Sequence, residues 1–340
     1  ALALLESQTL IQRNGEFYEY LTDEEQDVEA EIKNTEIDTD AVRSELEKLV
    51  FEGVIRARKI RWDESGQDYS FTRKLDDTQL GREYELAINV ITSFNDHRDA
   101  FEKHKTDTVY SDELRVVMPE SERLIRDLML YKKTEKYISH ETRATQQDAV
   151  KRILAEKAGQ NGERYNQLRT LVSSLMGKAF YFVKGVEIEL AGDDGQTKVQ
   201  RAFVELAKQT YPHLKMLRGK HYQEGEISTI LTQGEQGLLD DETVLPEGQQ
   251  EMFAHIQSNH RGGIRTTVKS ILEKFERKPY GWSYAAVLCT LAHLCARGKI
   301  EVRESTNLLD DSELTRALTN SNVQGNLILD PQVEFTPGQV

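Results

Sequence analysis

Apolar and polar residues follow the most regular pattern between residues 264 and 303, where they predict two helices and then a strand. Apolar residues first recur every three or four positions, which is the spacing of an amphipathic helix. Pro279 and Gly281 interrupt it, and Ser283 can cap a second, almost wholly apolar helix. The alternation from 299 to 303 predicts a half-buried strand. This order of elements is typical of a winged helix.

A similar pattern occupies residues 1–62. Two alternating runs flank Asn14 and Gly15, a pair that predicts a β-hairpin. Thr22 and Glu25 have the spacing of a capping box, which predicts the start of a helix. A second helical pattern and a strand follow, so we predict a first winged-helix-like module here.

The middle region, 63–192, alternates between strand and helix patterns. Two amphipathic segments, 145–158 and 163–178, are separated by a glycine-containing stretch and predict a long helical hairpin. A turn at Lys184 and Gly185 predicts a β-hairpin. Because strands lead into helices, we predict a central α/β region. Its other expected strands are 69–71, 85–92 and 113–118.

Helical patterns dominate the remainder, so residues 193–340 are predicted to form a helical domain that contains the second winged-helix-like segment, 264–303. The stretch 234–246 has the composition of an exposed linker. The predicted fold class is therefore mixed α+β and predominantly helical, with winged-helix-like modules flanking a central α/β region with long helices.

The chain is acidic, with a formal net charge of -14, which argues against a protein that coats nucleic acid indiscriminately. Its basic residues are concentrated, however. Residues 258–303 contain nine Lys or Arg against three Glu, whereas residues 1–50 contain 14 Asp or Glu against four Lys or Arg. A local basic patch can bind nucleic acid on an acidic protein, although a solvated helix face balanced by acidic neighbours explains the same charges.

The candidate nucleic-acid contacts lie on and around the second winged-helix-like segment. Its second helix, from 284 to 295, has no Arg, Lys, Asn or Gln to read base edges. We therefore expect contact with phosphate, independent of sequence, or a helix used for protein packing. The candidate residues are Arg261, Arg265, Lys269, Lys274, Arg277, Lys278, Lys299 and Arg303.

No catalytic motif is recognisable, and we assign no catalytic residue. The nearest string to a phosphate-binding loop, around Gly177 and Lys178, lacks the first glycine and the hydroxyl that would hold magnesium. Cys289, His293 and Cys295 lie on the apolar helix, where such residues are usually core, so no metal site is expected.

One alternative chemistry uses the hairpin of the central region. Glu187 and Glu189 share a strand face near Lys184, an arrangement from which a metal-dependent nuclease centre can be imagined. We keep this as a minor hypothesis.

The location expected from the sequence is the cytoplasm. No apolar run reaches the roughly 18 residues that span a membrane, and the first residues do not resemble a signal peptide. Two cysteines on one apolar helix suit a reducing compartment.

Four strings resemble those of the BrxC/PglY family of the BREX phage-defence systems: 18–25 (YEYLTDEE), 71–77 (FTRKLDD), 80–86 (LGREYEL) and 278–282 (KPYGW). Members of that family are large P-loop ATPases related to the AAA+ class, with winged-helix and helical regions after the ATPase core. The resemblance implies a fragment that lacks the P-loop. It also implies ATP and magnesium for the full-length protein, other BREX proteins and DNA as partners, and a role in antiviral defence alongside DNA methylation.

The leading hypothesis is a non-catalytic fragment of a BREX ATPase that mediates protein–protein assembly, self-association or sequence-independent DNA contact. No cofactor is expected in this chain. The alternatives are a stand-alone winged-helix DNA-binding regulator and, less favoured, the metal-dependent nuclease.

Overall fold

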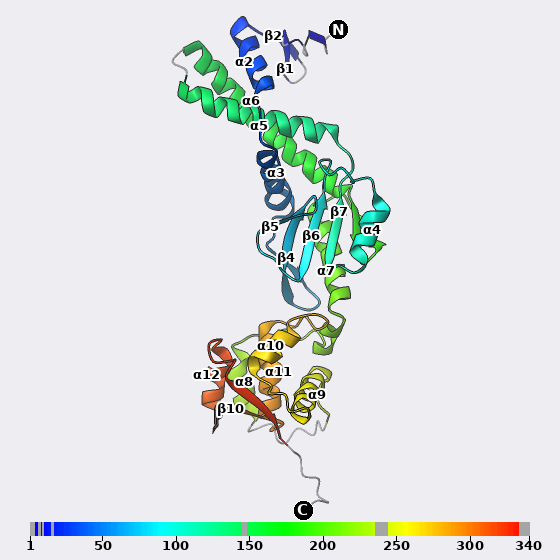
Figure 1. Cartoon of the computed structure of the whole chain (residues 1–340), viewed down its shortest axis with the longest axis vertical. Helices are drawn as coiled ribbons and strands as arrows, with labels where there is room; N and C mark the ends of the chain where they lie inside the picture. The colour runs from blue at the N-terminus through cyan, green and yellow to red at the C-terminus, as the bar shows by residue number, and fades with distance from the viewer. Residues whose placement is uncertain are drawn as a thin grey trace, which may run out of the picture. The chain divides into compact units, whose positions relative to one another are not determined.

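The computed structural model describes residues 4–5, 8, 10–14, 17–144, 148–234 and 244–332, coloured along the chain in Figure 1. The linker predicted at 234–246 lies outside the described residues except for its ends. The chain forms two compact units, the first from residues 1–58 and 70–203 and the second from residues 59–69 and 204–340.

A seven-stranded mixed sheet has the strand order β3-β4-β6-β7-β8-β9, with β5 paired to β4. Strands β4, β6 and β7 are parallel, whereas β8 and β9 continue the sheet antiparallel. Every residue of β6 and β7 is buried, as expected of parallel strands covered on both faces. The predicted strands and the hairpin at Lys184 and Gly185 are confirmed. The strands are β3 (Lys59–Trp62), β4 (Gln67–Leu75), β5 (Thr78–Leu80), β6 (Leu86–Ile91), β7 (Glu113–Val117), β8 (Phe180–Val183) and β9 (Val186–Glu187).

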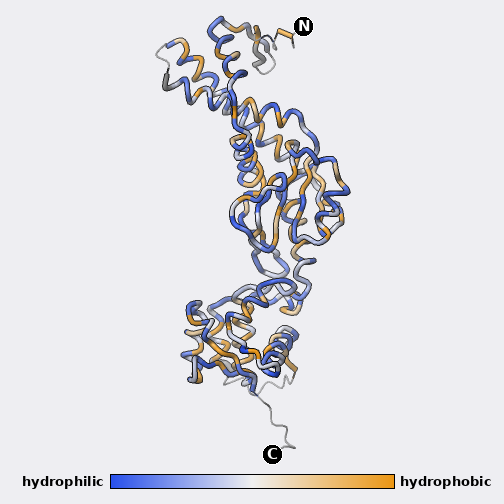
Figure 2. Tube along the Cα trace, in the orientation of Figure 1, coloured by the Kyte–Doolittle hydropathy of each residue, from blue (hydrophilic) through white to orange (hydrophobic). Residues whose placement is uncertain are grey.

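Helix α4 (Phe101–Val109) connects β6 to β7. The two long helices α5 (Glu122–Ala144) and α6 (Asp148–Gly177) pack against each other, and Figure 2 shows hydrophobic and hydrophilic residues mixed along both. This pair is the helical hairpin of the unit. The interruption predicted between 158 and 163 is wrong, because α6 runs through both of its glycines as one helix.

The continuity of α6 has a simple physical reason. A glycine inside a helix costs only about 1 kcal/mol relative to alanine, which packing along the same helix can offset. Leu154 and Leu168, on either side of the glycines, are buried. Gly159 and Gly162 have open space around them, so neither glycine is required there by a close neighbour.

The chain begins with the hairpin β1 (Ile11–Asn14) and β2 (Phe17–Tyr20), followed by α2 (Asp23–Asn34). The capping box predicted for α2 is confirmed: the Thr22 hydroxyl accepts from the Glu25 N–H, and the Glu25 carboxylate accepts from the Thr22 N–H at 2.8 Å. These residues therefore form the hairpin and helix that the sequence indicates.

The rest of the segment predicted as a first winged-helix-like module is grouped differently. Helix α3 (Thr39–Glu47) continues into the π-helix η1 (Lys48–Ile55), and β3 is a strand of the seven-stranded sheet. The buried residues of η1, among them Leu49 and Phe51, pack on α6, so residues 39–58 join the sheet unit.

The second unit is mainly helical. Antiparallel strands β10 and β12 pair, β11 adds a short edge, and a single bridge joins Thr267 to Ile328. The helix, turn, helix and strand predicted at 264–303 are confirmed. Besides the end of α7 (Gly195–Thr210), the elements are η2 (Pro212–Leu217), α8 (Glu226–Gly234), α9 (Glu247–Arg261), α10 (Val268–Phe275), α11 (Tyr284–Ala296), β10 (Ile300–Glu304), β11 (Asn307–Leu308), α12 (Asp311–Thr319) and β12 (Leu327–Pro331).

Candidate nucleic-acid interface

The turn between α10 and α11 is built around an aromatic cluster. The Phe275 and Trp282 rings stack with centroids 4.7 Å apart, and Tyr280 lies edge-on to Trp282. The Trp282 N–H donates to the Phe275 carbonyl at 2.8 Å, which fixes where α11 begins. Tyr280, Gly281 and Trp282 of the KPYGW string are therefore buried in the core of this unit, whereas Lys278 and Pro279 are exposed.

Gly281 has a structural requirement in this turn. Its φ is +63°, and a Cβ there would lie 2.3 Å from the Tyr211 ring. Its carbonyl accepts from the Tyr69 hydroxyl at 3.0 Å. Any other residue at this position would strain the turn.

Helix α11 occupies the place of a recognition helix but is covered on nearly all sides. It packs against α8, α9, α10 and β10. None of its 13 residues is exposed, and Leu288 and Leu291 have no solvent-accessible surface. A helix must expose one face to enter the major groove of DNA. In the described structure, α11 therefore offers no exposed face of the kind that reads bases.

The wing, formed by β10 and β11, has little free positive charge. Arg303 is exposed, but its guanidinium lies 3.1 Å from the Glu301 carboxylate and 3.4 Å from the Asp330 carboxylate. Lys299 is half-buried and lines a surface hollow beside His260 and Arg261. Leu308 is 57% exposed at the tip. The charge of Arg303 is therefore engaged by carboxylates of the protein itself.

The remaining candidates lie along the segment 261–278, which contains six Lys or Arg against two Glu. Arg261, Arg265, Lys269, Arg277 and Lys278 are all exposed. Within the described residues, Arg265 and Lys269 form no ion pair. Their charges are therefore available to an external anion.

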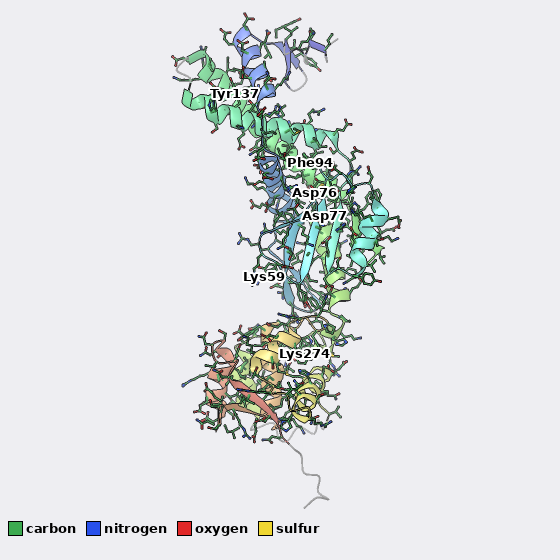
Figure 3. All side chains as sticks on the ribbon, viewed as in Figure 1. Lys59, Asp76, Asp77, Phe94, Tyr137 and Lys274 are labelled. Atoms are coloured by element: carbon green, nitrogen blue, oxygen red, sulfur yellow. The ribbon has the colours of Figure 1, made fainter. Side chains whose placement is uncertain are left out.

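Lys274, labelled in Figure 3, differs from its neighbours. It is half-buried, and its amine lies 5.4 Å from the Tyr280 ring centroid and 5.9 Å from that of Phe275. This cation–π arrangement uses Lys274 to cover the aromatic cluster. The structure thus separates Lys274 from the freely exposed cations.

Of the cysteines and histidine of α11, Cys289 is a core residue, as the sequence predicts, whereas His293 and Cys295 are half-buried. Burial raises the pKa of the Cys289 and Cys295 thiols to about 12, and burial lowers the pKa of His293 to about 4. The Cys289 thiol donates to the Gln223 carbonyl. No group of three or more metal-ligating side chains occurs in the part of the chain that the structure describes.

The hairpin residues of the nuclease hypothesis are placed on the surface. Glu187 and Glu189 are exposed, and the Lys184 amine pairs with the Asp112 carboxylate at 2.6 Å. The two glutamates therefore lack both a third ligand among the described residues and the lysine that the hypothesis used.

A charged row inside the sheet was not predicted from the sequence. Lys74, Asn89 and Arg115 are register partners on β4, β6 and β7, so their side chains lie on one face. Asn89 is fully buried. The signal was present, since Asn89 and Arg115 interrupt otherwise apolar strands.

Arg115 is the centre of this row. Its guanidinium donates to Glu113 at 3.0 Å, to Asp77 at 2.9 Å and to Asp107 of α4 at 2.8 Å. It also lies 3.2 Å from His104 Nδ1. Three carboxylates surround one buried cation, and the row joins α4 to the sheet.

Asn89 and Lys74 complete the hydrogen bonding. The Asn89 amide donates to Asp77 at 2.9 Å and to Glu113 at 3.0 Å, and the Lys74 amine donates to Glu113 at 2.8 Å. Because its members satisfy one another, the row has the properties of a structural network and not of an open ligand site.

The carboxyls at the end of β4, labelled in Figure 3, have opposite pKa shifts. Burial tends to raise the pKa of Asp77, but the Asn89 hydrogen bond and the Arg115 charge outweigh it and lower the pKa. Burial raises the pKa of Asp76, although the Thr92 N–H and hydroxyl donate to it at 2.7 and 2.8 Å. Burial chiefly lowers the pKa of His104.

Among the described helices, none is both long and apolar enough to cross a membrane. The fold and the surface together define a protein in which a mixed-sheet domain is joined to a winged helix-turn-helix domain.

Comparison with known families agrees with this class. Residues 35–206 match the fourth domain of the BREX ATP-binding protein BrxC, described as having a six-stranded β-sheet. Residues 213–333 match the BrxC winged helix-turn-helix domain. The chain therefore belongs to the BrxC family of BREX proteins, which confirms the resemblance found in the sequence. No solved structure matches it.

Proposed function

We propose that this chain is a non-catalytic module of a cytoplasmic BREX defence ATPase, and that it contacts duplex DNA through phosphates without reading sequence. One observation carries the proposal: α11 is buried, while exposed cations gather around α10. Phosphate contacts need only exposed positive charge and hydrogen-bond donors, whereas base reading needs a helix face that α11 does not offer.

The proposal does not include ATP binding by this chain. The family is named for ATP binding, and this chain has no phosphate-binding loop pattern. We infer that ATP and magnesium bind another part of the full-length protein. The remaining surfaces would then serve assembly with other BREX proteins or with a second copy of the chain.

A charge-reversal experiment tests the DNA contact. Arg261→Glu, Arg265→Glu and Lys269→Glu are combined in one variant, and its affinity for a fluorescent random duplex is measured by anisotropy at about 50 mM salt. Loss of three phosphate contacts should weaken binding about tenfold or more.

The matched control reverses cations in the other unit. Arg123 and Arg126 are exposed on α5, so Arg123→Glu and Arg126→Glu change the net charge without touching α10. This control should bind within about twofold of the unaltered chain if only the local patch matters. Equal losses in both variants would mean that overall charge, and not the surface around α10, governs binding.

A stand-alone DNA-binding regulator makes a different prediction. It would discriminate its own site from unrelated duplexes by about 10³ or more in affinity. Burial of α11 supports the sequence-independent alternative, in which unrelated duplexes compete equally.

A further inference from the structure

The turn between α12 and β12, residues 320–326, has the sequence NSNVQGN and contains no charged residue. Asn320, Ser321, Asn322 and Asn326 are exposed. The side chains of Ser321, Asn322 and Asn326 hydrogen-bond to no residue that the structure describes. The turn therefore presents several amide and hydroxyl donors to solvent.

Hydrogen bonds hold this turn against the beginning of α10 and of α11. The Lys269 N–H donates to the Gln324 carbonyl at 3.2 Å. The Gln324 side chain is buried, and its amide donates to the Leu318 carbonyl at 2.7 Å and to the Tyr284 hydroxyl. The turn is thus a fixed part of the winged helix-turn-helix domain.

The turn also has internal order. The Asn320 Oδ1 accepts from the Asn322 N–H at 3.1 Å, and the Asn326 N–H donates to the Val323 carbonyl at 2.7 Å. Because the Asn320 Oδ1 already accepts this hydrogen bond, the Asn320 amide nitrogen remains available to donate to a ligand. Such a turn orients donors before any ligand binds.

One exposed cation, Lys269, lies directly beside the turn. A Cβ at Gly325 would lie 3.8 Å from the Lys269 Cδ, so the aliphatic part of Lys269 covers this part of the turn. The next residues run along the segment before α10, because the Leu329 N–H donates to the Thr266 carbonyl at 3.0 Å. Arg265 precedes Thr266, so the antiparallel pairing places it near Leu329 and Asp330, beyond the end of the turn.

We propose that residues 320–326 form the neutral half of the DNA-contacting surface and donate hydrogen bonds to the phosphates that Lys269 attracts. The inference rests on the proposed DNA contact. Asparagine amides and serine hydroxyls are common donors to phosphate oxygens, and they carry no base information there. Neutral donors add affinity without releasing a counterion.

Salt dependence separates the two halves of the surface. Ser321→Ala, Asn322→Ala and Asn326→Ala, combined, should weaken duplex binding about fivefold or more at every salt concentration, because up to three hydrogen bonds are lost. The slope of log affinity against log salt should stay unchanged. Lys269→Ala should instead reduce the magnitude of that slope by about one.

A second variant is designed to bind duplex more tightly than the unaltered chain. Asn322→Arg should tighten binding and steepen the slope by about one, because it adds a phosphate contact at an exposed position. Asn34→Ala with Asn166→Ala, exposed on α2 and α6, is the matched control and should leave affinity unchanged.

The outcomes are distinguishable. If the unaltered chain and the triple variant bind equally while Lys269→Ala binds less, the role of the turn is wrong and the DNA contact stands. If the unaltered chain does not bind duplex at low salt, both proposals fail. Loss of affinity together with a lower unfolding midpoint for the triple variant, and no gain from Asn322→Arg, would also overturn the role of the turn.

Discussion

Gly281 shows how one residue can decide the geometry of the winged helix. It sits between Tyr280 and Trp282 in the KPYGW string, with φ of +63° and the Tyr211 ring against its α-carbon. The string was recognised from the sequence by resemblance. The structure adds the physical reason for the glycine in it. A side chain at this position would push apart the cluster from which α11 starts.

Gly281→Ala should lower the free energy of unfolding of this unit by about 2–4 kcal/mol, which combines an unfavourable φ with overpacking. Denaturant unfolding followed by tryptophan fluorescence measures this directly, because the only two tryptophans, Trp62 and Trp282, both lie in this unit.

Gly263→Ala is the matched control for that change. Gly263 has φ of +67° and open space around it, so alanine should cost only about 1 kcal/mol. Equal losses in the two variants would show that contact with Tyr211 does not set the requirement for glycine.

At the scale of elements, the charged row of the sheet makes stability depend on pH. The folded-state pKa of Asp77 is lowered, so its ionised carboxylate stabilises the fold. This stabilisation is fully present above the unfolded pKa of about 4 and is lost as pH falls through the lower folded value. Burial raises the pKa of Asp76, so the contribution of Asp76 to stability is instead lost as pH rises.

Asp77→Asn should therefore be most destabilising near neutral pH, and the difference from the unaltered chain should shrink below about pH 4. Urea unfolding followed by far-ultraviolet circular dichroism between pH 7 and 3 checks this. Asp96→Asn, at an exposed carboxyl without an ion pair among the described residues, should show no such trend. A destabilisation that is constant with pH would contradict the ionic role of Asp77.

Local signals predicted elements well where one or two residues decide them. The Thr22–Glu25 capping box and the Ser283 cap both start helices where expected; the Ser283 hydroxyl accepts from the Ala286 N–H at 3.2 Å. Helix α10 begins at Val268, later than the apolar spacing indicates, because the Thr267 hydroxyl caps it.

Other features depend on contacts between distant residues and could not be predicted from local patterns. The basic set around α10 was evident from composition, but the ion pair of Arg303 with Asp330 depends on the pairing of β10 with β12. The alignment of Asn89 with Arg115 depends on strand register in the same way. The turn at 320–326 has no charge or apolar periodicity, so only its position beside Lys269 shows its relevance.

At the scale of the whole molecule, the two BrxC domain matches fall mainly in different units, and so do the acidic segment 1–50 and the basic segment 258–303. Residues 1–50 have a formal charge of 4 − 14 = −10, whereas residues 258–303 have 9 − 3 = +6. The acidic segment should repel duplex and the basic segment should attract it, so the proposal needs only local electrostatics.

The most direct test of the account is the salt dependence of duplex binding by the unaltered chain. Anisotropy titrations with unrelated duplexes between about 50 and 200 mM salt give the slope of log affinity against log salt. Up to five exposed cations around α10 predict a slope of about −3 to −4.5, identical for every duplex. A slope near zero, or a preference of about a hundredfold for one sequence, would contradict the account.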